Sequence, residues 1–524
     1  MKQIEASKLQ QMVVGAYELL NENKGLVNEL NVFPVPDGDT GTNMTMTMKS
    51  GVDKVLSANA TSADEILKAL SQGSLMGARG NSGVILSQLV RGLAKASKGK
   101  SALTVADLTE GINLANQTAY KAVMKPTEGT ILTVSQKITD KANEINSNDI
   151  ELDQYLFEII AEGQKALDNT PNQLPVLKEA GVVDSGGQGL IILLKGAFNA
   201  LNSDIDIDDI KSHNAVSQKE WPFELKFEVA TTDEAAKSIL ENLSAVADEI
   251  ESEFKDEALI ASLKTDNVSQ VIQILTVDGV ILHAELTNLK PNLEKLESKK
   301  KESAKKYGFV AISRGDGYDA ILESMNIDQI ISGGQTMNPS TEDIFNSLEE
   351  INAENIIIFP NNKNIIMSAK QAADITEKNA VVVETRSIPE TFTAMLEFDE
   401  DVDIKENAEN MAEAIKDVHI AEFSISIRDT SVGGVEIHRD DYLGILDGNI
   451  VASNTDLNES VTITLAKAIE EEDDLSLVTI YYGEDIDRKD AKDLAKKLGK
   501  KFKDVDVELV YGGQPVYYYT VTLE

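Results

Sequence analysis

The sequence predicts a multidomain protein with an all-α eight-helix N-terminal domain, a small α+β central domain and an α/β C-terminal domain. Three observations support this order. The chain has 524 residues, which is too many for one hydrophobic core. Residues 1–201 repeat apolar side chains at spacings of three and four. From residue 307 onward, short apolar strands alternate with helical patterns, as in βαβ units of a parallel sheet.

Six amphipathic segments underlie the helical interpretation of residues 1–201. Each carries its apolar residues on one face of a 3.6-residue period, which is typical of helices that pack into a bundle. The segments are residues 6–30, 62–77, 82–96, 104–124, 152–168 and 187–201. We expect about eight helices in this domain. Residues 202–220 are polar, acidic and without a period, so we expect a linker there.

Residues 221–306 form the predicted central domain. Alternating patterns predict strands at 222–230, 258–265, 269–277 and 280–286. A helical pattern covers 232–251, and a charged helix is expected after Pro291.

Residues 307–524 form the predicted C-terminal domain. Its first strands are expected at 308–313, 328–332, 355–359 and 380–385, with helical patterns between them. The pattern beyond Leu396 is compatible with one large domain or with two lobes, and we expect one.

Composition excludes several classes of chemistry. The chain has no cysteine, so disulfides, thiolate catalysis and cysteine zinc sites are excluded. Its four histidines are at least nineteen residues apart, which disfavours a local histidine metal site. The formal net charge of −39 repels nucleic acid and anionic lipid. No apolar run has the roughly 18 residues of a membrane span, and we read no signal peptide, so we expect no stable membrane insertion and a cytoplasmic location.

The stretch "NVFPVPDGDTGTNM", residues 31–44, is the strongest candidate for a binding loop. Two prolines exclude a regular helix or central strand. Asp37 and Asp39 flank one glycine, and two carboxylates on a tight turn can share hard cations such as Mg²⁺. Thr40 and Thr42 add hydroxyl groups. An isolated pattern of this kind is more often an ordinary Asp-Gly turn, so its context decides.

Three further loops of the helical domain have a similar character. They are "GARGNSGV" (77–84), "KPTEGTIL" (125–132) and "VVDSGGQGL" (182–190), and each precedes an apolar helix. The N–H groups at a helix start favour an anion, although small polar residues there also serve as ordinary caps. Known nucleotide motifs are not matched, because "SKGKS" (97–101) lacks the first glycine of a Walker A loop, Ala94 standing in its place. Any nucleotide site is therefore of another type.

In this order and spacing, "VPDGDTGTNM", "ARGNSGVILSQ", "EGTIL" and "VVDSGGQGL" resemble the ATP-binding domain shared by dihydroxyacetone kinases and bacterial fatty acid kinases. The stretches "IISGGQTMNPSTEDI" (330–344) and "FPNNKNIIMSAKQAA" (359–373) are similar to the C-terminal region of the fatty acid kinase ATP-binding subunit. The resemblance covers nearly the whole chain and is weakest at about 202–300.

The resemblance implies an eight-helix domain that binds ATP with Mg²⁺, as two ions. Asp37 and Asp39 would be the metal ligands and, with Thr40, the catalytic residues. The implied nucleotide contacts are Thr42, Asn43, Met44, Asn81, Ser82, Gly83, Gly129, Thr130, Asp184 and Gly186. A third aspartate of dihydroxyacetone kinases has no counterpart here, where Asn31 is the nearest polar residue.

The family's central domain also carries a paired-histidine zinc motif, which this chain matches only in part. His283 stands alone, with Glu285 as the one substitute ligand nearby. A lone histidine on an alternating strand is more often packed or solvated than bound to a metal, so we do not expect zinc.

We therefore expect an ATP-dependent kinase subunit that converts fatty acids to acyl phosphate. A fatty acid carboxylate is already ionised at pH 7 and needs no general base, so the scarcity of histidine is no obstacle. The resemblance implies a separate fatty acid binding protein as the partner that presents the acyl chain. We expect the C-terminal domain to serve partner docking and the central domain to serve a homodimer. The loop at 333–341 is either a capped βα turn, with Ser340 and Asp343 as a capping box, or a docking loop.

Two alternatives stay open. A small-polyol kinase subunit would act on a substrate such as dihydroxyacetone, but it leaves residues 300–524 unexplained. A nucleotide-responsive binding protein without turnover is disfavoured by the intact pair of aspartates.

Overall fold

The computed structural model describes residues 2–32, 38–123, 125–147, 149–203, 223–243, 246–255, 258–265, 267–277, 279–288, 305–334, 338–426, 429–432, 434–471 and 475–524. Its contacts divide the chain into two compact units. One consists of Met1–Asp206 together with Ala304–Glu524, and the other of Ile207–Ser303.

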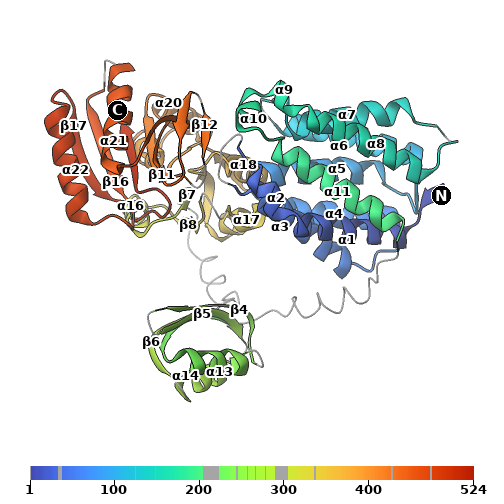
Figure 1. The fold of residues 1–524 in the computed structure, drawn as a ribbon, viewed down its shortest axis with the longest axis horizontal. Helices are drawn as coiled ribbons and strands as arrows, with labels where there is room; N and C mark the ends of the chain where they lie inside the picture. Colours follow the sequence, from blue (N-terminus) through green and yellow to red (C-terminus); the bar gives the residue numbers. More distant parts are fainter. Residues whose placement is uncertain are drawn as a thin grey trace. The chain divides into compact units, whose positions relative to one another are not determined.

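The first two hundred residues are helical, as predicted (Figure 1). Among the residues that the structure describes here, eight long helices of 14 to 18 residues are α1 Ala6–Glu22, α3 Thr40–Ser57, α4 Ala63–Met76, α5 Gly80–Ala96, α6 Val105–Ala122, α7 Ile131–Glu144, α8 Leu152–Asp168 and α11 Ser185–Leu201. Three short helices are α2 Lys24–Glu29, α9 Thr170–Gln173 and α10 Pro175–Ala180. The strands β1 Gln3–Ile4 and β2 Leu103–Thr104 pair antiparallel.

The bundle is held by apolar faces that meet at short distances. Helix α11 buries Ile191 and Leu193 against its neighbours and packs along α1. A Cβ atom on Gly196 would lie 2.4 Å from the Gly15 carbonyl oxygen, so only glycine permits this approach of the two backbones. Close packing of this kind fixes the positions of the helix ends, which carry the candidate loops.

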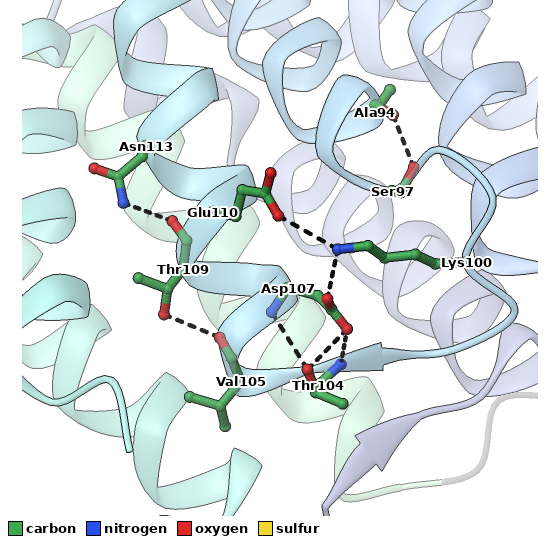
Figure 2. Close-up of polar contacts among 9 residues, drawn as sticks. All are labelled: Ala94, Ser97, Lys100, Thr104, Val105, Asp107, Thr109, Glu110 and Asn113. Carbon is green, nitrogen blue, oxygen red and sulfur yellow. Dashed lines mark hydrogen bonds and ion pairs between the residues drawn. The ribbon is translucent and has the colours of Figure 1, made fainter. Parts of the chain in front are cut away.

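The start of α6 shows how the sequence sets a helix boundary (Figure 2). The Asp107 N–H donates to the Thr104 hydroxyl, and the Asp107 carboxylate accepts from the Thr104 N–H, which is a complete capping box. The Lys100 ammonium pairs with Asp107 and reaches Glu110. Burial raises the pKa of Asp107, but the bonds from Lys100 and Thr104 outweigh it and lower that pKa below its usual value.

The second unit is a βαββαβ arrangement. Its elements are β3 Phe223–Ala230, α13 Asp233–Leu243, β4 Asp248–Lys255, β5 Ala258–Thr265, α14 Val268–Val277 and β6 Val280–Asn288. The strands lie in the order β4-β5-β3-β6 and every pairing is antiparallel. Both helices cover one face of the sheet, and Leu225, Phe227 and Val229 fill the core between sheet and helices (Figure 1).

Several sequence predictions for this unit need correction. Residues 269–277 were expected as a strand but form α14, because Val271 and Leu275 recur at a spacing of four and face the core. The helix expected over 232–251 ends at Leu243, and β4 follows it. The predicted helix after Pro291 lies outside the described residues, as does most of the predicted linker at 202–220.

His283 and Glu285 lie on the edge strand β6, and both are exposed. In register, His283 pairs with Glu228 and Glu285 with Lys226 of β3. Within the described ranges, no group of three or more histidine, cysteine, aspartate or glutamate residues could hold a metal ion.

The C-terminal region begins with a four-stranded parallel sheet. Its strands, β7 Lys305–Ser313, β8 Gln329–Ser332, β9 Ala353–Phe359 and β10 Asn379–Val382, lie in the order β10-β9-β7-β8. All four predicted strands are present. Five helices accompany this sheet: α16 Asp316–Ser324, α17 Thr341–Glu350, α18 Ile366–Ile375, α19 Ile388–Leu396 and α20 Ile404–Ala414. Separate apolar clusters pack on it, one including Phe309 and Phe359 and the other Val310 and Ile358.

A second, six-stranded sheet follows in the order β15-β14-β11-β18-β16-β17. Its strands are β11 His419–Ile425, β14 Tyr442–Leu446, β15 Asn449–Asn454, β16 Leu477–Tyr482, β17 Asp506–Tyr511 and β18 Tyr519–Leu523. Helices α21 Leu457–Glu471 and α22 Arg488–Lys501 accompany it, and β12 Thr430–Val432 pairs with β13 Val435–Ile437. The region expected as one domain thus contains two sheets with their own apolar clusters.

A search of the described helices for an apolar segment long enough to cross a bilayer finds none.

The capping box of α6 generates a local stability prediction. We expect Thr104→Ala to destabilise the first turn of α6 by about 1 kcal/mol, because the Asp107 N–H loses its acceptor. Hydrogen exchange of the peptide spanning 103–113 should become roughly fivefold faster. Thr104→Ser, which keeps the hydroxyl, is the matched control and should exchange like the wild type. Equal exchange in all three proteins would show that this cap does not hold the helix start.

Candidate functional site

Four helix starts that carry the predicted loops lie together in the bundle. The Ser185 hydroxyl, at the start of α11, lies 3.2 Å from the Thr40 hydroxyl at the start of α3. A Cβ atom on Gly80, the first residue of α5, would lie 2.4 Å from the Asn43 amide nitrogen of α3. The Ile131 N–H, at the start of α7, bonds to the Asp184 carboxylate that precedes α11. Loops separated by more than a hundred residues therefore form one cluster.

The start of α3 is held by α2. The Thr42 N–H donates to the Asn28 side-chain oxygen, and the Asn28 amide donates back to the Thr42 hydroxyl, both at 3.0 Å. Gly41 lies against the Lys24 carbonyl oxygen, where a Cβ atom would come within 2.2 Å. Asn28 is a positioning residue that the sequence analysis missed, because nothing in "KGLVNEL" marks one asparagine of a helix as a tether.

Of the two predicted metal ligands, Asp37 and Asp39, the structure describes only Asp39. Asp37 lies outside the described residues. Asp39 is the N-cap residue of α3 and its carbonyl accepts from the Asn43 N–H, but its carboxylate makes no capping bond with the helix. Instead, the Asp39 carboxylate accepts a hydrogen bond of 2.6 Å from Asn338 of the C-terminal region. Asn31 is the polar residue nearest to the position where dihydroxyacetone kinases have a third aspartate. Its side chain is buried.

The start of α5 contacts α3 through a second set of bonds. Thr47 donates to the Asn43 carbonyl and accepts from the Arg79 N–H, at 2.7 and 3.2 Å. Gly80 has a φ of +58°, in the left-handed region that favours glycine. Gly83 faces the Thr47 hydroxyl, which a Cβ atom would approach to 2.3 Å.

The other two nucleotide contacts predicted here, Asn81 and Ser82, are partly exposed in the first turn of α5. Their backbone N–H groups belong to the turn that is left without intrahelical partners at any helix start.

The starts of α7 and α11 complete the cluster. Thr130 is the N-cap residue of α7, and its hydroxyl donates to the Thr127 carbonyl. Gly129 has a φ of +80°, and its N–H donates to the Thr133 hydroxyl. Gly186 lies in the first turn of α11 and faces Ile131.

Asp184 caps α11 from a buried position. Its carboxylate accepts from the Gly187 N–H at 2.7 Å, and its own N–H donates to the Thr170 hydroxyl. Burial raises the pKa of Asp184 to about 6, although the N–H bonds from Gly187 and Ile131 oppose this shift. The group thus titrates near neutral pH and helps to fix the start of α11.

Met44 is placed differently from the other predicted nucleotide contacts. Its side chain is fully buried in α3, and its sulfur lies against Gly189 of α11. Met44 therefore packs the two helices together, and its direct contact with a nucleotide stays a prediction.

The C-terminal region meets this cluster through polar contacts. Besides Asn338, the Thr341 N–H donates to the Ala78 carbonyl at 3.1 Å, and Arg79 donates to the Asn338 carbonyl at 2.7 Å. The predicted capping box is present, since Ser340 and Asp343 exchange both bonds at the start of α17. Asp343 also lies 3.5 Å from Arg79. The loop was recognisable from its sequence, but its contact was not, because Arg79 and Asn338 are 259 residues apart.

The donor set suits magnesium better than a transition metal. Mg²⁺ binds oxygen ligands and is often held by one or two carboxylates together with substrate phosphates and water. The described residues supply the Asp39 carboxylate and the Thr40 hydroxyl at the start of α3, beside helix N–H groups for an anion. Neither thiolate nor imidazole ligands are among the predicted site residues. The residues present therefore fit a metal–nucleotide complex.

Two family models match the chain. The model of the DAK2 domain matches residues 34–199. The FakA-like C-terminal model, which describes a domain of fatty acid kinases, matches residues 308–524.

Curated relatives match along nearly the whole length. An uncharacterized protein of Staphylococcus aureus (strain USA300) is 35% identical over 538 residues, covering 98% of this chain and 98% of that protein. An uncharacterized protein of Staphylococcus aureus (strain bovine RF122 / ET3-1) is 36% identical over 543 residues, again with 98% of each covered.

Solved structures share a weaker likeness to part of the chain. The Streptococcus pneumoniae fatty acid kinase (Fak) B3 protein loaded with linoleic acid is 11% identical, with a TM-score of 0.30, over 42% of this chain and 99% of that chain. DegV, a fatty acid binding protein from Bacillus subtilis, is 11% identical, with a TM-score of 0.32, over 42% and 99%.

The raised pKa of Asp184 generates a prediction about pH. The unfolded carboxyl loses its proton near its ordinary pKa of 3.8, whereas the folded one keeps its proton until about pH 6. The folded state is therefore stabilised relative to the unfolded state at low pH, and this contribution is lost as pH rises from about 4 to about 6.

Asp184→Asn keeps an oxygen for the Gly187 N–H but cannot ionise. In metal-free protein, we expect the variant to lose less stability than the wild type over this pH interval, as measured by hydrogen exchange of α11. Parallel pH profiles for the two proteins would contradict the prediction.

Proposed function

Because the chain belongs to the family of FakA-like fatty acid kinase proteins, we propose that it is an ATP-dependent kinase subunit that converts fatty acids to acyl phosphates. The single observation that carries the proposal is the convergence of four helix starts around Asp39, Thr40 and Asn43. Such starts present N–H groups and the positive ends of helix dipoles to an anion. A triphosphate is negatively charged, so its charge complements the positive ends of these helices.

The chain's own residues would hold the reactants in place. Asp39, with Asp37 beside it in the sequence, would carry Mg²⁺, which neutralises charge on the β- and γ-phosphates when it is bound. The first turns of α5 and α11 would donate N–H bonds to phosphate oxygens through Ser82 and Gly186. Asn28 and Thr47 act indirectly, since they fix Thr42 and Asn43.

The acceptor chemistry fits a site without a histidine among its predicted residues. A fatty acid carboxylate oxygen would form a bond with the γ-phosphorus while the bond to the β-phosphate oxygen breaks, so that ADP leaves with the electron pair. The acceptor carries no proton at neutral pH, and no general base is needed. A polyol acceptor would have to give up a hydroxyl proton in the same step.

We assign the acyl chain to a separate fatty acid binding protein. The cavity at the carboxyl ends of β7 and β9, lined among others by Arg314, Asn361 and Glu422, has a volume of about 70 Å³. Pockets for drug-sized ligands measure roughly 300–1,000 Å³, so this cavity is too small for a long acyl chain. Two larger hollows, of about 540 and 320 Å³, are lined largely by charged side chains, which do not suit an acyl chain. We propose the C-terminal region as the docking surface for this fatty acid binding protein, because its Asn338 reaches Asp39, the proposed metal ligand.

The edge strand β6 supports the proposal of a homodimer. Val280, Leu282 and Leu286 are exposed on this strand, at 66%, 58% and 50%. Among the described residues no strand pairs with the outer edge of β6, and an edge with exposed apolar side chains is suited to pair with a second copy.

We expect Leu282→Lys to shift the chain from twice its mass of 57.0 kDa to the monomer in sedimentation experiments. Leu396→Lys, at another exposed leucine, is the matched control. A wild-type monomer, or a variant that stays dimeric, would count against this surface.

The kinase assignment is tested by ATP consumption with Mg²⁺ and oleate, with and without a fatty acid binding protein. We expect acyl phosphate only when that protein is present. Asp37→Ala and Asp39→Ala should each lower the rate by at least roughly 100-fold, since each removes a proposed metal ligand. Asp53→Ala is the matched control, because Asp53 lies at the other end of α3 and pairs with Lys49.

Three outcomes would redirect the assignment. ATP turnover with dihydroxyacetone but not with oleate would favour a small-polyol kinase. Binding of ATP without turnover of either acceptor would favour a nucleotide-responsive binding protein. Full activity in Asp39→Ala would remove the metal role from this loop.

A further inference from the structure

The C-terminal region contacts the start of α3 in the helical region. The Asn338 amide donates to the Asp39 carboxylate at 2.6 Å and lies 3.4 Å from the Asn43 side-chain oxygen. Asn338, Asp39 and Asn43 are 3%, 8% and 4% exposed in this arrangement. Asp39 and Asn43, two of the residues proposed to hold magnesium and nucleotide, are thus nearly closed off from solvent.

A row of polar contacts continues this interface along α5, away from the start of α3. The Asn81 amide donates to the Asn364 side-chain oxygen at 3.1 Å. Further along α5, Gln88 donates to Gln371 of α18 at 3.2 Å, and Gln371 donates to the Leu75 carbonyl at 2.7 Å. These bonds join uncharged groups that water can also satisfy, so each contributes modestly. The contacts of Arg79 with the Asn338 carbonyl and with Asp343 are charged ones across this interface, and the ion pair is partly exposed to solvent.

The closed arrangement conflicts with turnover. A phosphoryl transfer site has to admit a metal–nucleotide complex and an acceptor in line with the γ-phosphate. Here an amide donor already bonds one oxygen of the Asp39 carboxylate, Oδ2, and lies where a metal or a phosphate bound by that oxygen would have to come. The Asn338 side-chain oxygen is buried without a hydrogen-bond partner among the described residues, which is a cost that opening would remove.

We propose that this arrangement is a closed state in which the C-terminal region and Mg²⁺·ATP compete for the start of α3. Binding of Mg²⁺·ATP displaces Asn338 from Asp39 and releases the interface formed by Asn338, Thr341, Asn364 and Gln371. The same release exposes the face that an acyl carrier must reach, a consequence that rests on the proposed function. Competition is reciprocal. Mg²⁺·ATP binding weakens the interface, and loss of the interface tightens Mg²⁺·ATP binding, through the same coupling free energy.

Hydrogen exchange of the unmodified full chain tests the release directly. The Thr341 N–H bonds to the Ala78 carbonyl across the interface, on the side that contributes no nucleotide contact. We expect the amide at Thr341 to exchange at least roughly fivefold faster when Mg²⁺ and a non-hydrolysable ATP analogue are added. Slower or unchanged exchange would overturn the proposal.

Two variants separate competition from a positioning role of Asn338. Asn338→Ala and Gln371→Ala should both tighten the Mg²⁺–analogue complex in calorimetric titration, by about fivefold. Gln371 bonds to Gln88, to the Leu75 carbonyl and to the Thr341 hydroxyl, and none of its printed bonds reaches Asp39, so its loss weakens the interface without removing a partner of that carboxylate. Asn379→Ala, on β10 with its partner in β9, is the matched control and should bind like the wild type.

Weaker binding in Asn338→Ala, with no change in Gln371→Ala, would mean that Asn338 orients Asp39 for the metal, and the closed-state proposal would fall. Unchanged binding in both would overturn it as well. Neither measurement requires turnover or a fatty acid binding protein. Failure of this proposal is therefore distinguishable from failure of the kinase assignment.

Discussion

Close backbone approach at the start of α3 is the constraint on which the candidate site depends. Gly41 sits against the Lys24 carbonyl oxygen, at a distance that leaves no space for a Cβ atom. This contact brings α2 near enough for Asn28 to bond both the N–H and the hydroxyl of Thr42. Asp39 and Asn43 flank this tethered turn. The positions of the polar groups thus follow from a packing requirement in the backbone, and the chemistry follows from those positions.

Local electrostatics differ from what the net charge of the chain suggests. An overall charge of −39 would repel a polyphosphate. The cluster around α3 offers helix starts and the Asp39 carboxylate, the metal ligand that we propose, in place of basic side chains. Arg79 is close by, but it is committed to the Asn338 carbonyl and to Asp343. A site of this type depends on metal and on backbone geometry, which is consistent with the small number of basic residues in the four loops.

The sequence predicted well what depends on local patterns. Helices of residues 1–201 and the strands β7 to β10 follow from periodicity, since each buries a face that repeats along the chain. The pattern failed at α14, where "SQVIQILTV" alternates for a few residues and also repeats at a spacing of four. Short apolar segments satisfy both periods, and only the packing against β3 decides between them.

Contacts between residues far apart in the chain could not be predicted from the sequence. Each candidate loop was recognisable from its glycines and small polar residues, but their convergence depends on how the bundle packs. Asn28 and Thr47 carry no signal, because an asparagine or threonine within a helix has many ordinary roles. The bond from Asn338 to Asp39 joins residues 299 positions apart, and no local rule reaches that far.

The order of the two compact units along the chain has a consequence for synthesis on the ribosome. Met1–Asp206 and Ala304–Glu524 form one unit, yet the whole of Ile207–Ser303 is translated between them. At about 5–20 residues per second, several seconds or more separate the synthesis of the helical bundle from that of the C-terminal residues that contact it. Throughout that interval the start of α3 has no Asn338 to pair with. On the nascent chain, the proposed nucleotide site is therefore made before the part of its own unit that covers Asp39.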